Sequence, residues 1–90
     1  MHQLHVHIVW STKYRYSVLK GEVQIRCRDL IRQICDSQDV SILKGVVSKD
    51  HIHLDVSYPP KLSVSDLVKR LKGRTARLLL DEFAELKKRY

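Results

Sequence analysis

Apolar and polar residues alternate along the first part of the chain, and the spacing then changes to that of a helix. The alternation runs from Gln3 to Trp10 and predicts a strand with one buried face. The residues expected on that buried face are Leu4, Val6, Ile8 and Trp10. Residues 20–36 show helical spacing and predict an amphipathic helix. Its apolar stripe consists of Val23, Cys27, Leu30, Ile31 and Ile34.

Two further strands joined by a tight turn are predicted next. The segment from Val40 to Val47 is rich in Val and Ile and is interrupted by Gly45, where we expect a β-bulge. Ser48-Lys49-Asp50 fits a hairpin turn. The third strand runs from His51 to Ser57 and ends before Pro59-Pro60, because proline cannot donate a hydrogen bond to a neighbouring strand.

The last third of the chain predicts two helices. Ser63-Val64-Ser65-Asp66 places a hydroxyl and a carboxylate where they cap a helix start. Gly73 is expected to end or kink that helix. Arg77 to Lys88 then predicts another helix, with Leu78, Leu79 and Phe83 facing inward.

This order of elements (strand, helix, strand, strand, helix, helix) is most of a ferredoxin-like or RRM-like split β-α-β arrangement. We therefore expect residues 1–90 to form a single α+β domain, an antiparallel sheet with helices on one face. In this arrangement the first and third strands lie side by side. A fourth strand is missing, so the domain is expected to be incomplete at its C-terminus.

Composition narrows the class of protein further. The 90 residues are 43% hydrophobic and 30% charged, as in a folded globular domain. A net charge of +7 favours a polyanionic partner, most simply nucleic acid. Neither a membrane-spanning run nor a signal peptide is apparent, so the cytoplasm is the expected location. Cys27 and Cys35 lie eight residues apart in one predicted helix, about 12 Å, too far for a disulfide.

The candidate chemistry is a pair of histidines in the third predicted strand. Side chains alternate along a strand, so His51 and His53 point the same way while Ile52 points into the core. Two imidazoles aimed at one place are half of a divalent-metal site. Asp55 shares their face and is a candidate oxygen ligand, the alternative being an exposed strand-end carboxylate. His7, on a neighbouring strand, is expected in a structural or supporting role.

Basic residues gather in two segments that are candidates for binding DNA. In the first loop, Lys13 and Arg15 flank Tyr14, a composition suited to gripping phosphate and stacking on bases. The second group surrounds Gly73 and consists of Lys69, Arg70, Lys72, Arg74 and Arg77. Arg70, Arg74 and Arg77 share one helical face if the helix continues through the glycine. The alternative for this group is an ordinary solvated helix face.

Several blocks in collinear order resemble the HUH single-tyrosine transposases of bacterial insertion sequences. These blocks are His7-Ile8-Val9-Trp10 with Thr12-Lys13-Tyr14-Arg15, Asp50-His51-Ile52-His53-Leu54, Pro59-Pro60-Lys61 with Ser63-Val64-Ser65, Leu71-Lys72-Gly73-Arg74, and Glu82-Phe83 with Leu86-Lys87. Together they span nearly the whole chain. Asp55 departs from the family pattern, in which this position is normally apolar.

The resemblance implies a metal-dependent reaction on single-stranded DNA. It implies that His51 and His53 hold Mg²⁺ or Mn²⁺ against a phosphate. It also implies a homodimer that recognises hairpin DNA. The family's nucleophilic tyrosine lies on a helix that would follow Tyr90, so strand cleavage is not expected of these 90 residues alone. The alternatives are a non-catalytic hairpin-binding module or repressor, and a ferredoxin-like RNA binder, although the aromatic RNA-binding strand motif is absent.

Overall fold

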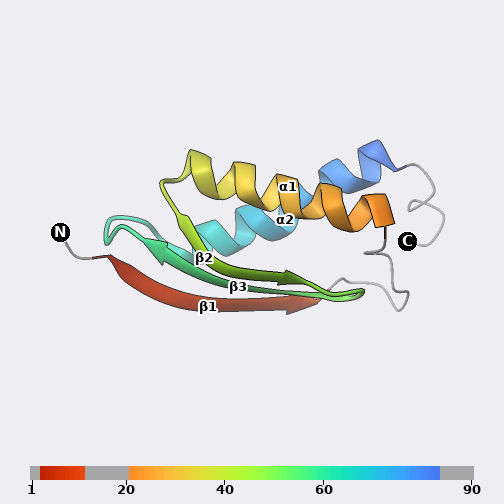
Figure 1. Cartoon of the computed structure of the whole chain (residues 1–90). Helices are drawn as coiled ribbons and strands as arrows, with labels where there is room; N and C mark the ends of the chain where they lie inside the picture. The colour runs from red at the N-terminus through yellow and green to blue at the C-terminus, as the bar shows by residue number, and fades with distance from the viewer. Residues whose placement is uncertain (1–2, 12–20, 84–90) are drawn as a thin grey trace.

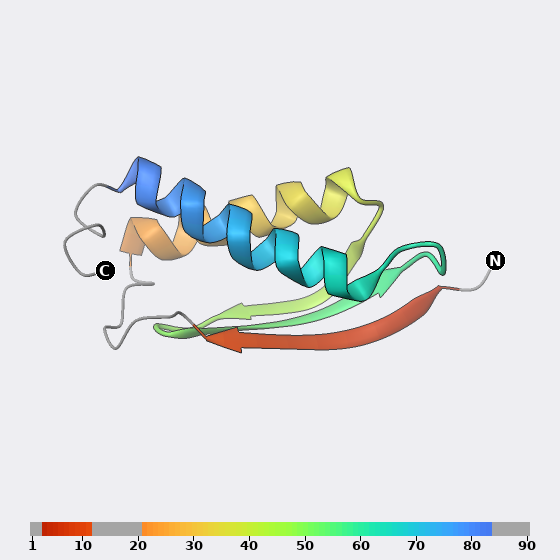
Figure 2. The same cartoon turned by 180° about the vertical axis from the view of Figure 1, so that it is seen from behind.

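The computed structural model describes residues 3–11 and 21–83 as a three-stranded antiparallel sheet covered by two helices. The strands are β1 (Leu4–Ser11), β2 (Ser41–Val47) and β3 (His51–Tyr58), in the order β1-β3-β2. The helices α1 (Gly21–Ser37) and α2 (Val64–Glu82) lie on the same face of the sheet (Figures 1 and 2). The predicted α+β fold is confirmed, including the placement of β1 beside β3.

The core lies between the helices and one face of the sheet. From the sheet, Ile52, Leu54 and Val56 are almost fully buried, as their alternation predicted. The helices contribute Cys27 and Leu71, both with no exposed surface. Other buried residues include Ile8, Trp10, Val23, Leu30, Ile31, Ile34 and Leu67. Leu4 departs from the prediction: it lies at the end of edge strand β1 and is 44% exposed.

The bulge in β2 lies earlier than predicted. Ile42 pairs with Val56 and Lys44 pairs with Asp55, so Leu43 is the extra residue. Gly45 follows the bulge and pairs with Leu54. A Cβ at Gly45 would lie 3.2 Å from Leu54 Cδ2, so the glycine serves close packing rather than the bulge itself.

Helix α2 is continuous through Gly73, so the prediction of two separate helices was wrong. Ser63 caps the helix start by accepting a hydrogen bond from the Asp66 backbone N–H at 3.4 Å. The helix continues because Leu71, Thr75 and Leu79 bury one stripe on both sides of the glycine, and this packing outweighs glycine's low helix propensity. The C-cap is Phe83, and residues 84–90 of the predicted second helix lie outside the described part of the chain.

Neither α1 nor α2, the helices of the described part of the chain, combines the length and the hydropathy that a membrane span requires.

Candidate metal site and nucleic-acid surfaces

Both helices lie on one face of the sheet, which leaves the other face uncovered (Figure 1). Side chains on this uncovered face line a shallow hollow of about 250 Å³. Its lining comes from all three strands and the β2–β3 turn: His7, Lys44, Val46, Ser48, His51, His53 and Asp55. The strand register explains the grouping, because His7 lies opposite Asp55 and Val9 lies opposite His53. Residues far apart in sequence therefore meet on one uncovered surface, as the alternation predicted.

Three imidazole rings lie close together in this hollow. The ring centroids of His51 and His53 are 4.8 Å apart, with the planes at 74°. His7 reaches in from β1, and its ring centroid lies 5.6 Å from that of His53. The rings of His7 and His51 are accessible to a ligand, since their side chains are 53% and 42% exposed, respectively.

Two carboxylates contact the outer members of this imidazole row. Asp50 Oδ1 lies 2.8 Å from His51 Nδ1. Asp55 Oδ1 contacts His7 Nδ1 across the β1–β3 pair. In this arrangement Asp55 is engaged by His7, and it lines the same hollow as His51 and His53.

The donor set fits part of a divalent-metal site. Mg²⁺ and Mn²⁺ favour oxygen ligands, which two imidazoles alone do not supply, and a ligating histidine commonly pairs its other nitrogen with a carboxylate. His51 has such a carboxylate in Asp50. Over residues 3–11 and 21–83, however, no three His, Cys, Asp or Glu side chains are grouped so that they could hold a metal ion. His51 and His53 therefore fit as two ligands, with further ligands to come from a phosphate, from water or from other residues.

Sequence reasoning missed the contribution of β2 to the hollow. Ile42, before the bulge, is partly buried against the core, whereas Lys44 and Val46 line the open face. The extra residue Leu43 reverses the side-chain alternation, which moves Lys44 to the side of the histidines. The only signal in the sequence was the expected bulge. It was predicted at Gly45, after Lys44 in the chain, and so did not indicate that Lys44 lies on the side of the histidines.

The basic residues of α2 lie on the other side of the sheet from the histidines. All five predicted DNA-binding residues of this helix are exposed: Lys69, Arg70, Lys72, Arg74 and Arg77. Helix α2 runs unbroken through Gly73. As a result, the three arginines at positions 70, 74 and 77 share one helical face. Arg70 and Arg74 also line a groove between α1 and α2. The sheet therefore separates the basic surface of α2 from the hollow. The other predicted DNA-binding residues, Lys13, Tyr14 and Arg15, lie outside the described residues.

The two cysteines belong to the core rather than to a site. Both Cys27 and Cys35 are free and buried, as the sequence predicted. Burial raises the pKa of each thiol to about 11. Since the thiolate is the reactive form, neither is a candidate nucleophile.

Comparison with known protein families agrees with this fold and arrangement. All of residues 1–90 match the family described as "Transposase IS200 like", and the chain belongs to that family.

The chain is 36% identical over 89 residues to the ISDra2 transposase TnpA of Deinococcus radiodurans. It is 37% identical over 84 residues to the transposase for insertion sequence element IS200 of Salmonella typhimurium. These matches cover 99% and 93% of this chain, respectively, but 64% and 55% of the two relatives. The chain thus spans between about half and two thirds of their length.

A solved structure is similar over the same region. The crystal structure assigned to a transposase from Deinococcus radiodurans R1 matches with a TM-score of 0.90 and 34% identity. The match covers 97% of this chain and 67% of that one.

Proposed function

We propose that this chain acts in DNA transposition, by binding single-stranded hairpin DNA and holding a divalent cation, Mg²⁺ or Mn²⁺, at His51 and His53. The observation that supports the metal site is the 4.8 Å spacing of these two rings on the uncovered face of the sheet. Ile52, between them, is buried in the core and fixes the strand beneath. A bound divalent cation would polarise a phosphate oxygen and offset the charge that develops there.

The metal proposal is tested by measuring Mn²⁺ affinity. Binding is measured by the broadening of NMR signals from residues near the bound Mn²⁺. Replacing both His51 and His53 with Ala should abolish saturable binding. The matched control is His5→Ala, an exposed β1 histidine that does not line the hollow. Equal affinity of the double variant and the unaltered chain would reject the site.

Asp55 is proposed as a further oxygen ligand. Its carboxylate contacts His7 in the hollow, so ligation would need the side chain to exchange this partner for the metal. If it does ligate, Asp55→Ala lowers Mn²⁺ affinity while the fold is retained. Unchanged affinity would leave Asp55 as the partner of His7 only.

The DNA-binding surface is proposed to include the exposed basic residues of α2 and the first-loop residues Lys13, Tyr14 and Arg15. The net charge of +7 supports a polyanionic partner. Binding through phosphates releases counterions, so affinity for hairpin DNA should fall steeply with added salt. A flat salt dependence would argue against this surface.

We propose that the 90-residue polypeptide binds DNA without cleaving it. The family resemblance assigns the nucleophilic tyrosine to none of residues 1–90. The test mixes the polypeptide with labelled hairpin DNA and Mn²⁺ and looks for a covalent adduct. Bound DNA without an adduct supports the proposal, and an adduct overturns it.

The second candidate is a binding module or repressor that does not need the metal. The observation that favours it is the separation of the α2 arginines from the histidines by the sheet. Hairpin binding that persists in a chelator and in the His51 and His53 variants would support this candidate. Loss of binding under both conditions would favour a metal-dependent DNA complex.

A homodimer is the proposed assembly. The outer edge of β1 pairs with no other strand among the described residues, and an open sheet edge favours pairing with a second chain. Sedimentation that shows only monomer at high concentration would contradict this. Action in the cytoplasm is likewise proposed, with the free thiols of Cys27 and Cys35 suited to a reducing compartment.

A further inference from the structure

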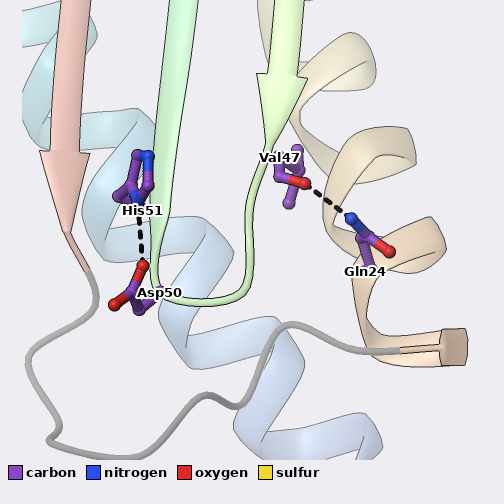
Figure 3. Close-up of polar contacts among 4 residues, drawn as sticks. All are labelled: Gln24, Val47, Asp50 and His51. Atoms are coloured by element: carbon purple, nitrogen blue, oxygen red, sulfur yellow. Dashed lines mark hydrogen bonds and ion pairs between the residues drawn. The ribbon is translucent and has the colours of Figure 1, made fainter.

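Asp50 lies at the tip of the β2–β3 hairpin, directly before His51. Figure 3 shows its carboxylate turned to the imidazole, with Oδ1 2.8 Å from His51 Nδ1. An ionised carboxylate accepts hydrogen bonds but has no proton to donate. The proton of this bond must therefore sit on Nδ1, which leaves Nε2 of a neutral His51 ring with its lone pair available.

The turn that holds Asp50 is anchored on both sides. The backbone N–H of Ser48 donates to the carbonyl of His51 at 2.8 Å and closes the hairpin. Gln24 on α1 donates through Nε2 to the carbonyl of Val47 at 2.6 Å, which ties the end of β2 to the helical layer (Figure 3). Asp50 is thus presented to His51 from a turn whose backbone is held in place.

We propose that Asp50 is a positioning residue that fixes His51 in its Nδ1–H tautomer and presents Nε2 to a ligand in the hollow. Histidines that bind metals commonly donate their other N–H to a carboxylate, and loss of that partner lowers metal affinity about 10–100-fold. The tautomer follows from the contact itself. Only its consequence for metal affinity rests on the proposed metal site.

The first experiment measures the tautomer directly, without metal. Long-range ¹H–¹⁵N NMR correlations of the whole chain, recorded with the imidazoles neutral, distinguish a protonated Nδ1 from a protonated Nε2. We expect His51 to be Nδ1–H in the unaltered chain and to shift towards Nε2–H in Asp50→Ala. Asp50→Asn should retain Nδ1–H, because its amide oxygen can still accept the bond.

The matched control is Asp55→Ala, which removes a carboxylate that lines the hollow and contacts a different histidine. Asp55 contacts His7, so its loss should leave the tautomer of His51 unchanged. Amide spectra establish that each variant folds. If His51 keeps the same tautomer in Asp50→Ala as in the unaltered chain, the proposal is overturned.

The second experiment measures Mn²⁺ affinity in the same variants. Asp50→Ala should weaken binding about 10–100-fold, and Asp50→Asn should restore part of the loss. If the unaltered chain binds no Mn²⁺, the proposed metal site fails, while a tautomer shift in Asp50→Ala still supports positioning by Asp50. If Mn²⁺ binds equally well to the unaltered chain, Asp50→Ala and Asp50→Asn, Asp50 does not position a metal ligand.

Discussion

Gly73 offers a direct test of how α2 is built. It is the tenth of the nineteen residues of the helix, and a Cβ placed there would meet nothing within 4 Å. Alanine is favoured over glycine inside a helix by about 0.8–1 kcal/mol, and here no clash offsets that gain. For a domain of this size, 1 kcal/mol corresponds to a rise of about 4–8 °C in the melting temperature.

The assay is thermal unfolding followed by circular dichroism, with the same substitution at the other two glycines as controls. Gly45→Ala should not stabilise, because the new Cβ would lie 3.2 Å from Leu54 Cδ2. Gly21→Ala should destabilise by about 1–2 kcal/mol, because Gly21 has a φ of +53°, a conformation that costs other residues this much. The expected order of melting temperature is thus Gly73→Ala, then the unaltered chain, then Gly21→Ala.

An unchanged or lower melting temperature for Gly73→Ala would refute the reasoning. It would mean that the glycine does end or bend the helix, as the sequence first suggested. Hairpin-DNA affinity should remain the same in this variant, because the exposed charges beside Gly73 are not altered.

Further predictions concern the core and the DNA surface. Thr75 Oγ1 is buried with no hydrogen-bond partner among the described residues, so Thr75→Val should stabilise the fold by about 1 kcal/mol in urea unfolding. Cys27 and Cys35 should resist alkylation at mildly alkaline pH until the chain unfolds, since burial raises the pKa of each to about 11. Because the folded pKa lies above the ordinary 9.0, their contribution to stability is complete below pH 9.0 and is lost as the pH rises towards 11; substituting both with Ala should flatten this part of the stability profile. Arg70→Gln and Arg74→Gln should each reduce the salt slope of hairpin-DNA binding by about one, and unchanged slopes would place the phosphate contacts elsewhere.

The strands and the histidine face could be predicted because the relevant rule is local. Alternation along a strand fixes which side His51 and His53 occupy, whatever the rest of the fold does. The continuity of α2 could not be read in the same way. It depends on buried contacts made by Leu71, Thr75 and Leu79, and these outweigh the local preference of a glycine.

The neighbours of the histidines were harder to predict, because they depend on register. A shift of one residue turns every later side chain of a strand to the opposite face. The placement of Lys44 therefore follows from the bulge at Leu43, which no local pattern locates to a single residue. The contact between Asp50 and His51 likewise depends on side-chain conformations at the turn.

The sheet acts as a partition between two chemically different surfaces. Imidazoles and carboxylates occupy one side, and the arginines of α2 occupy the other. A nucleic-acid strand that touches both must bend around a rim of the sheet, whereas two separate strands could occupy the sides independently. Competition between short and long oligonucleotides would therefore report whether one molecule or two saturate a single protomer.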